Sequence, residues 1–263
     1  MSNFETLTYE LDGAVAIITL NRPESRNSLN RTLRREFVEA MRKADFDTDV
    51  RVIMLAGNGK GFCAGADLQE MLPPPEDPGF VTSLINSEYT PMLQSITKNT
   101  KPVISVVQGA AAGIGGALAM ACDLMIMAED SFLYSAFGAI GLVPDGGTHK
   151  LLQNALGNKK AYEMIAFSQR LPAADCERWG LANRVVPAES LLSEAKAWAQ
   201  QLAEQAPYTL TFSKKLIQES QTSTFDQIMD RESQCQDICF QSDDFREGGA
   251  AFFEKRKPQF KGR

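Results

Sequence analysis

Hydrophobic positions follow two different patterns along the chain. In the first half, short apolar runs predict strands in "TLTYEL", "AVAIITL", "RVIMLAG", "PVISVVQG", "LMIMAED" and "SFLYSAF". Asp12-Gly13 separates the first two runs, which predicts a hairpin. Apolar residues at helical spacing predict helices over about 31–44, capped by Asn30, and about 80–97. This alternation of strands, loops and helices is typical of an α/β protein.

Helical patterns dominate from about residue 148 onward. The expected segments are 148–156, 158–168, 189–205, 208–221, 225–240 and 243–254, interrupted by a short strand in "NRVVP". The sequence therefore predicts a core over residues 1–200 and a C-terminal helical region over residues 201–263. The segment "PPPEDPG" predicts a surface loop between the two halves of the core.

Two glycine-rich loops each follow a predicted strand and lead into a helix, where backbone N–H groups are free. They are "GKGFCAGADL" (59–68) and "QGAAAGIGGALAMACDL" (108–124). Neither matches the P-loop or the GxGxxG dinucleotide pattern. Each could be only a tight turn with close helix packing. Together, however, they could direct two N–H groups at one carbonyl oxygen and form an oxyanion hole.

The stretch "GLVPDGGTHK" (141–150) places an acid within a turn. Pro144 and the two glycines favour the turn, and Asp145 could simply help to form it. In a dry pocket beside an oxyanion hole, the same carboxylate could move protons next to a thioester carbonyl. The sequence leaves both interpretations open.

Composition and charge narrow the classes of function. The chain has 263 residues, 44% of them hydrophobic, and a net charge of −6, which disfavours nucleic acid as the main ligand. Arg22, Arg26 and the terminal "EKRKPQFKGR" could clamp a phosphate or could be solvated charge. Five cysteines without a CxxC motif, no secretory signal and no apolar membrane span lead us to expect a cytoplasmic protein without membrane association. The single histidine, His149, has no GxSxG partner, and no residue cluster has metal spacing.

Six ordered segments resemble the enoyl-CoA hydratase/isomerase (crotonase) superfamily. They are "LNRPESRNSLN", "GKGFCAGADL", "KPVISVVQGAAAGIGGALAMACDL", "GLVPDGGT", "ERWGLANRVVP" and "AFFEKRKPQF". The resemblance implies a spiral of β-β-α units with a C-terminal trimerisation region, assembled as a homotrimer or a dimer of trimers. It also implies acyl-CoA thioester substrates, as in fatty-acid β-oxidation, and no cofactor besides the CoA of the substrate.

The same resemblance implies roles for individual residues. By position, the backbone N–H groups of Ala66 and Ile114 would hold an enolate oxygen. The segment 25–27 would border the adenine and phosphates, and Phe252 and Lys255 would reach CoA across the trimer interface. The full set of implied substrate contacts is Ser25, Arg26, Asn27, Ala64, Gly65, Ala66, Asp67, Leu68, Gly113, Ile114, Phe137, Phe252 and Lys255.

Departures from the family pattern decide which reaction is expected. Hydratases of the family carry two glutamates, and Ala117 and Phe137 occupy those positions here. Asp145 lies where one group of isomerases places its single acid, and phenylacetate-pathway isomerases resemble this stretch too. The turn is one residue shorter than the commoner PDAGGT form, so Asp145 could instead point to solvent.

We therefore expect a cofactor-independent enoyl-CoA isomerase with Asp145 as its proton shuttle. One alternative is a hydratase, another lyase or a hydrolase, in which Asp145 works with a second acid such as Glu88. Another is a non-catalytic acyl-CoA-binding protein. The kind of acyl group would depend on pocket residues expected near Met71, Leu84, Phe137 and Leu142.

Overall fold

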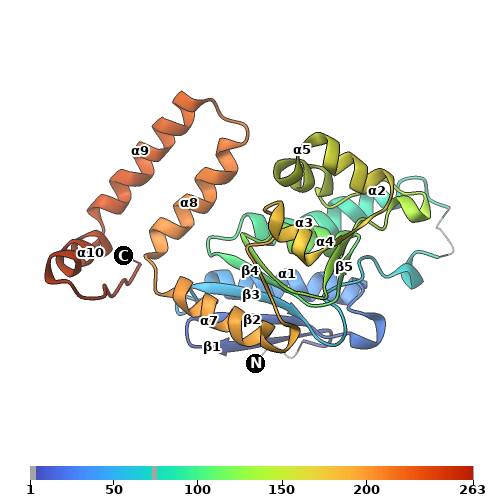
Figure 1. Ribbon diagram of the computed structural model, residues 1–263, viewed down its shortest axis with the longest axis horizontal. Helices are drawn as coiled ribbons and strands as arrows, with labels where there is room; N and C mark the ends of the chain where they lie inside the picture. Colours follow the sequence, from blue (N-terminus) through green and yellow to red (C-terminus); the bar gives the residue numbers. More distant parts are fainter. Residues whose placement is uncertain (1–3, 73–75, 263) are drawn as a thin grey trace.

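One large sheet organises the protein, whose computed structural model describes residues 4–72 and 76–262 (Figure 1). The strand order is β1-β2-β3-β4-β6-β9. The bounds are β1 (Leu7–Asp12), β2 (Val15–Leu20), β3 (Val52–Gly57), β4 (Val103–Val107), β6 (Leu124–Ala128) and β9 (Arg184–Val186). The first pair forms the predicted antiparallel hairpin, and every later pair is parallel. The predicted α/β class is confirmed.

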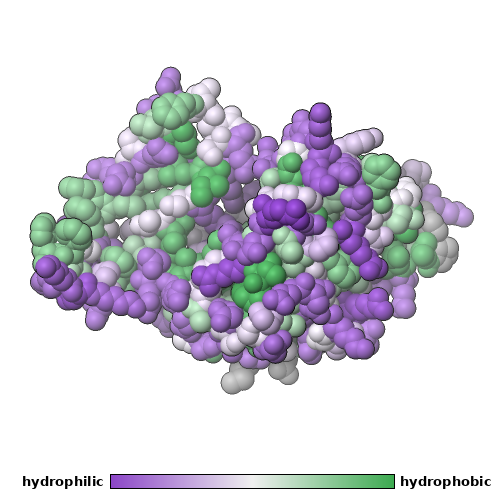
Figure 2. Space-filling model, in the orientation of Figure 1, coloured by the Kyte–Doolittle hydropathy of each residue, from purple (hydrophilic) through white to green (hydrophobic). Residues whose placement is uncertain are grey.

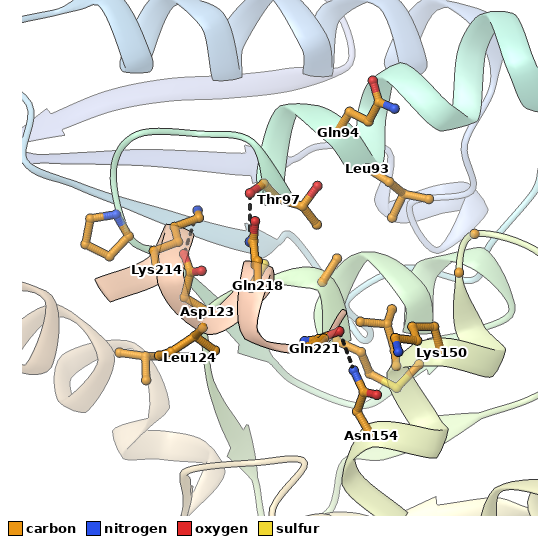
Figure 3. A pocket seen from close by; sticks show the side chains of 18 of the residues that line it. Leu93, Gln94, Thr97, Asp123, Leu124, Lys150, Asn154, Lys214, Gln218 and Gln221 are labelled. Atoms are coloured by element: carbon orange, nitrogen blue, oxygen red, sulfur yellow. Dashed lines mark hydrogen bonds and ion pairs between the residues drawn. The ribbon is translucent and has the colours of Figure 1, made fainter. Parts of the chain in front are cut away.

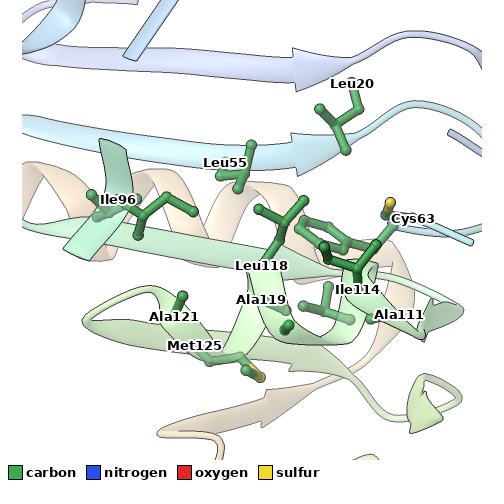
Figure 4. Packing of buried hydrophobic residues seen from close by; sticks show 14 of the residues in the cluster. Leu20, Leu55, Cys63, Ile96, Ala111, Ile114, Leu118, Ala119, Ala121 and Met125 are labelled. Atoms are coloured by element: carbon green, nitrogen blue, oxygen red, sulfur yellow. The ribbon is translucent and has the colours of Figure 1, made fainter. Parts of the chain in front are cut away.

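Both faces of this sheet are covered, which explains the continuous apolar runs of its strands. Along β3, Ile53 and Leu55 enter one hydrophobic cluster, and Val52 and Met54 enter another on the opposite face. The first cluster packs under α1 (Arg31–Phe46) and α4 (Ile114–Ala121), and α7 (Leu191–Ala203) covers the second. Figure 4 shows α4 packing its apolar side chains toward Leu55 of the sheet.

A second, three-stranded sheet has the order β5-β7-β8. Its strands are β5 (Ala110–Ala112), β7 (Phe132–Tyr134) and β8 (Arg170–Pro172). Only β7 was expected from the sequence. β5, β8 and the short helix α6 (Ala173–Arg178) were missed, because three to six residues carry too little periodicity to identify an element.

The predicted helix over residues 80–97 contains a widened turn. It consists of α2 (Phe80–Leu84), a π-helical turn over Ile85–Tyr89, and α3 (Thr90–Thr97). Pro91 accounts for the widening, because a proline inside a helix lacks an N–H and its ring displaces the carbonyl four residues earlier. The Thr90 N–H accordingly bonds the Ile85 carbonyl.

Two helices predicted after residue 148 join into one bent element, α5 (Thr148–Ala166). The bend lies at Gly157, whose φ of 71° is accessible at low cost only to glycine. The predicted gap between residues 156 and 158 therefore corresponds to a bend within one helix.

Helix α1 begins as predicted, because the Asn30 side chain accepts a hydrogen bond from the Leu33 N–H at 2.9 Å.

The last three helices form an arm that leads away from the sheets (Figure 1). They are α8 (Pro207–Ser220), α9 (Phe225–Gln241) and α10 (Asp243–Glu254). Lys214 fastens α8 to the core, because its ammonium lies 2.8 Å from the Asp123 carboxylate and 2.9 Å from the Ile96 carbonyl. The predicted division at residue 200 falls in the last turn of α7, which packs on the core.

Large apolar side chains are exposed along this arm, where Figure 2 shows hydrophobic surface. Among them are Phe225, Phe240, Phe252 and Phe253. Within the described part of the chain, no helix combines the length and apolar character needed to span a bilayer. Part of the predicted loop "PPPEDPG", residues 73–75, lies outside the described residues.

Candidate active site

The turn before α5 carries Asp145, whose side chain does not simply point into solvent. Pro144 is buried and Asp145 is half-buried. The Asp145 carbonyl accepts from the Thr148 N–H at 3.1 Å and from its hydroxyl at 2.6 Å, so the backbone starts the helix. The carboxylate oxygen Oδ1 is buried and has no hydrogen-bond partner among the described residues. The backbone of Asp145 thus forms the turn, while Oδ1 of its carboxylate has no partner among the described residues.

Gly146 lets this turn approach two helices closely. It has a φ of 63°, and a Cβ built there would lie 3.0 Å from Ala117 Cβ and 3.2 Å from Ile114 Cγ1, both on α4. The same position is 3.3 Å from Leu93 Cδ1 on α3. A side chain at residue 146 would push the turn outward. Glycine therefore keeps Asp145 beside the N-terminal turn of α4.

Burial raises the pKa of Asp145 to about 6, and only its own backbone N–H acts in the other direction. A carboxyl group with a pKa near the working pH can both accept and return a proton. These are the properties expected of a general base in a partly desolvated site.

The two glycine-rich loops predicted from the sequence meet at the same end of α4. Cys63 and Ala111 form a parallel bridge between them. Gly65 has a φ of 94°, and its Cβ position lies 2.8 Å from the Ala112 carbonyl and 3.5 Å from the Ile114 nitrogen. Neither the Ala66 N–H nor the Ile114 N–H donates a hydrogen bond to another described residue. Two free backbone donors therefore lie on adjoining segments, as an oxyanion hole requires.

Close packing also explains some of the α4 glycines. A Cβ at Gly115 would lie 2.5 Å from the Cys63 carbonyl, which no side chain could tolerate. The structural and functional interpretations of this loop are thus compatible, since close packing brings the two loops together.

Residues 25–27, which were expected to border CoA, lie in a loop stabilised by internal hydrogen bonds. The Asn27 side chain is fully buried, accepts from the Arg22 N–H at 2.9 Å and donates to the Asn58, Gly61 and Phe62 carbonyls. Its amide therefore shapes the loop and does not point outward. Ser25 and Arg26 lie on the same loop, and the Ala64 N–H bonds the Arg26 carbonyl at 2.9 Å.

Asp67, another expected contact, is a structural anchor. Arg22 lies 2.8 Å from its carboxylate, and the Gln69 N–H bonds it from the following turn. Burial opposes ionisation of Asp67, but the hydrogen bonds from Arg22, Ser28 and Gln69 outweigh burial and lower its pKa. Ala64 and Leu68 on either side are exposed and available to a ligand.

Ala117 and Phe137, the positions at which the sequence resemblance places the hydratase glutamates, are apolar and buried. Ala117 faces the Asp145 turn through Gly146. The Phe137 ring lies 3.8 Å from the Cβ position of Gly113, just before α4. Neither side chain can ionise or hold a water by hydrogen bonds. The region around the free N–H groups is therefore lined by hydrocarbon on these two sides.

A groove of about 760 Å³ lies between α3, α4, α5 and α8, and Gly146, the residue after Asp145, is part of its lining (Figure 3). Tyr89 and Gly146 line the groove, and Leu93 and Lys150 face it from α3 and α5. At the α8 end, Gln218 donates to the Thr97 carbonyl at 2.8 Å, beside the Lys214–Asp123 pair. The groove thus meets the turn that carries Asp145 at Gly146 and Gly147.

Glu88, the second acid considered from the sequence, faces a different part of the molecule. Its carboxylate lies 2.7 Å from Arg34 Nε and 3.8 Å from Arg31 Nε, and it lines a groove along α1. The charge of Glu88 is thus paired with two arginines. This arrangement argues against the pairing of Glu88 with Asp145.

Two predicted residues, Phe252 and Lys255, lie apart from this region within one chain. Phe252 is 79% exposed on α10 and Lys255 caps that helix, at the far end of the arm in Figure 1. Leu142 is half-exposed, whereas Leu84 is buried. His149 is exposed. Among the described residues no three His, Cys, Asp or Glu side chains cluster as metal ligands would.

Sequence reasoning missed Tyr89. Its hydroxyl is buried and has no hydrogen-bond partner among the described residues, and it lines the same groove as the Asp145 turn. A tyrosine on the inner face of a helix is indistinguishable from core packing in the sequence. The one local signal was Pro91, which indicates a distorted turn just before it.

Known proteins resemble this chain over nearly its whole length. The family model described as enoyl-CoA hydratase/isomerase matches residues 10–263. The 1,2-epoxyphenylacetyl-CoA isomerase of Escherichia coli K12 is 35% identical over 260 residues, covering 98% of this chain and 99% of that protein. The 2,3-dehydroadipyl-CoA hydratase of the same organism is 31% identical over 250 residues, covering 95% and 96%.

Solved structures show the same likeness in three dimensions. The enoyl-CoA hydratase of Bacillus anthracis matches with a TM-score of 0.93 at 29% identity, covering 98% of this chain and 100% of that one. The enoyl-CoA hydratase of Polaromonas sp. JS666 matches with a TM-score of 0.91 at 33% identity, covering 97% and 99%. These matches extend over the core and the arm alike. The chain belongs to the enoyl-CoA hydratase/isomerase (crotonase) family.

Proposed function

We propose that this protein isomerises a 3-enoyl-CoA thioester to a 2-enoyl-CoA thioester, with Asp145 as the group that moves the proton. The observation that carries the proposal is one half-buried carboxylate with a free oxygen beside α4, while the positions of the two hydratase glutamates hold Ala117 and Phe137. Hydration needs one group to activate water and another to protonate carbon. Isomerisation needs only one base and an oxyanion hole.

The reaction proceeds through a dienolate. Asp145 takes a proton from C2, the electrons of that C–H bond form a C1–C2 double bond, and the carbonyl electron pair moves onto the thioester oxygen. When the carbonyl re-forms, the C1–C2 electron pair moves to form the C2–C3 double bond of the product. The C3–C4 double bond then takes the same proton from Asp145 at C4. Hydrogen bonds from the Ala66 and Ile114 N–H groups hold the negative charge on the thioester oxygen meanwhile. Removing one donor of such a pair typically costs about 10²–10³ in rate.

Substrate binding follows from the same surfaces. The exposed residues Ala64 and Leu68, with the loop around Ser25 and Arg26, border the CoA moiety, and the groove beside Tyr89 takes the acyl group. Proton transfer of this kind uses no cofactor besides the CoA of the substrate. Relatives with hydratase and isomerase names share the family, so the apolar residues at positions 117 and 137 are what favours isomerisation here.

The assembly that fits this function is a homotrimer or a dimer of trimers. Exposed phenylalanines on the arm, including Phe252, supply an apolar surface for a neighbouring copy. In such an assembly Phe252 and Lys255 of one copy would approach CoA bound to another. Light scattering of the purified protein measures the mass of the assembly, and a monomer would contradict this part of the proposal.

The decisive variant is Asp145→Asn, which keeps the shape of the side chain and removes the base. We expect kcat on a 3-enoyl-CoA to fall by about 10³-fold or more, with CoA binding retained. Absorbance of the conjugated 2-enoyl product follows the reaction. In the protein itself, activity should fall as the pH drops through about 6, where Asp145 becomes protonated.

The matched control is Asp130→Asn, which removes an exposed carboxylate and should leave kcat unchanged. Isomerase activity retained by Asp145→Asn contradicts the assignment. Incubation with a 2-enoyl-CoA, followed by mass spectrometry, tests the competing hydratase function. A gain of one water in the product would replace isomerisation with hydration as the function of the site.

A further inference from the structure

Two buried oxygen atoms near the groove have no hydrogen-bond partner among the described residues. They are the Tyr89 hydroxyl and Oδ1 of Asp145. Tyr89 is 3% exposed. Buried polar atoms are nearly always paired in folded proteins, so each exception calls for an explanation. One of the two is a hydrogen-bond donor, and the other, as an ionised carboxylate, is an acceptor.

The two atoms belong to one region of the molecule. Tyr89 ends the π-helical turn, and Leu93 lies one helical turn later on the same face. Leu93 Cδ1 is 3.3 Å from the Cβ position of Gly146, the residue next to Asp145. Tyr89 and Gly146 also line the same groove. The donor and the acceptor therefore lie on neighbouring segments, which meet where Leu93 approaches Gly146.

The Tyr89 ring is held from two sides. The guanidinium carbon of Arg34 lies 5.2 Å from the ring centroid, and Arg34 is itself fixed by Glu88 at 2.7 Å and by the Leu29 carbonyl at 2.5 Å. On the other side, the widened turn before Pro91 sets the direction of the side chain. Arg34 and the widened turn thus position the Tyr89 phenol.

Tyr89 also keeps its proton at working pH. Burial raises its pKa to about 12; nearby Arg34 opposes this rise, and the charges of Asp145 and Glu70 reinforce it. The hydroxyl remains a donor throughout the range in which Asp145 titrates.

We propose that Tyr89 donates its hydroxyl hydrogen to Oδ1 of Asp145 when acyl-CoA is bound, and is a positioning residue for this carboxylate. The inference rests on the proposed role of Asp145 as base. In proteins without substrate, hydrogen bonds of the catalytic groups are often long and tighten only in the complex. With Oδ1 engaged, Oδ2 is left to take the proton from C2 and return it at C4. Tyr89 thus orients the shuttle without touching the reacting atoms.

The test uses Tyr89→Phe, which keeps the ring and removes only the hydroxyl. The matched control is Tyr9→Phe, because Tyr9 on β1 also has a buried, unpartnered hydroxyl but lies on the hairpin. The full-length protein, labelled with ¹³C at aspartate carboxyls, is titrated by NMR with saturating butyryl-CoA, which cannot isomerise. The Asp145 signal is the one absent from Asp145→Asn.

We expect Tyr89→Phe to raise the pKa of Asp145 by about one unit in the complex, because the ionised form loses a donor. On a 3-enoyl-CoA, kcat should fall about tenfold with KM unchanged. Tyr9→Phe should change neither quantity. Thermal unfolding should show no loss of stability in Tyr89→Phe, since the hydroxyl it removes has no partner.

An unchanged titration of Asp145 in Tyr89→Phe overturns the inference. So does a raised KM with an unchanged titration, which would make Tyr89 a substrate contact instead. The titration needs no turnover. If the wild-type protein fails to isomerise enoyl-CoA, the proposed function fails, while the NMR comparison still decides whether Tyr89 bonds Asp145.

Discussion

Asp145 and Glu36 are two acids of this molecule whose surroundings shift their pKa values in opposite directions. Glu36, on the inner face of α1, accepts from the Thr6 hydroxyl at 2.6 Å and from the Glu5 and Thr6 N–H groups at 2.9 Å. Burial opposes its ionisation, but these hydrogen bonds outweigh burial and lower its pKa. Around Asp145, burial meets no comparable opposition and raises the pKa to about 6.

The difference distinguishes an acid that stabilises the fold from an acid that is available for a reaction. Glu36 has its acceptor oxygens filled and fastens the start of β1 to α1, so nothing is left for a ligand. Oδ1 of Asp145 is buried without a hydrogen-bond partner among the described residues, whereas the carboxylates of Glu36 and Asp67 are paired. An acid that is buried and left unpaired is destabilising unless a ligand completes it. Substitutions at Glu36 and at Asp145 test this contrast.

The largest expected effect on stability is at Glu36. Glu36→Gln leaves an amide nitrogen that cannot accept from the Thr6 donors, and we expect a loss of about 3 kcal/mol in the free energy of unfolding at pH 7. Urea denaturation measures this quantity. Because the folded pKa is lowered, the stabilisation is present above the ordinary pKa of 4.5 and is lost as the pH falls below it.

Glu39→Gln on the same helix is the control, since Glu39 is exposed. It should change stability by no more than about 0.5 kcal/mol. Equal effects of the two substitutions would show that Glu36 is not the anchor described here.

The next effect tests whether placement of Asp145 matters. Gly146→Ala and Gly147→Ala both put a side chain at positive φ, but only the first meets α3 and α4. We expect Gly146→Ala to lower kcat/KM by about 10²-fold, because a small misplacement of a catalytic group carries such a cost. Gly147→Ala, with open space around its Cβ, should cost about 1 kcal/mol of stability and little activity. Steady-state kinetics with an enoyl-CoA compares the pair, and equal activities would contradict the positioning of Asp145 by Gly146.

The smallest expected effect is on stability at Asp145, where the pH dependence is opposite to that at Glu36. The folded pKa of Asp145, about 6, lies above its ordinary value of 3.8, so the folded protein loses stability as the pH rises from about 4 to 6. Asp145→Asn removes this penalty. We expect a gain of about 1–2 kcal/mol at pH 8, reduced by solvent screening of the partly exposed carboxylate, and no gain below pH 4. Thermal unfolding across this range checks it, and a destabilised variant at pH 8 would mean that Asp145 has a structural partner after all.

The sequence predicted the elements that depend on neighbouring residues, and it missed those that depend on residues far apart in the chain. The hairpin, the strands of the large sheet and α1 were foreseen, because burial imposes a pattern on neighbouring residues. The ordered motifs indicated the family that the comparisons confirm. β5 and β8 were missed, since three-residue strands are defined by their partners. Their pairing is a property of the folded chain.

At the site, the chain itself determined which groups are present: Asp145 in a glycine turn, two loops with free N–H groups, and no acid at positions 117 and 137. Only the tertiary structure decided where these groups point. In the folded protein, Oδ1 of Asp145 is buried without a partner among the described residues, and Glu88 pairs with Arg34 of α1. The Asn27 side chain stabilises a loop, and Tyr89 lines the groove. Local sequence sets backbone geometry, whereas burial and partnership arise between residues far apart in the chain, and these decide whether an acid is structural or chemical.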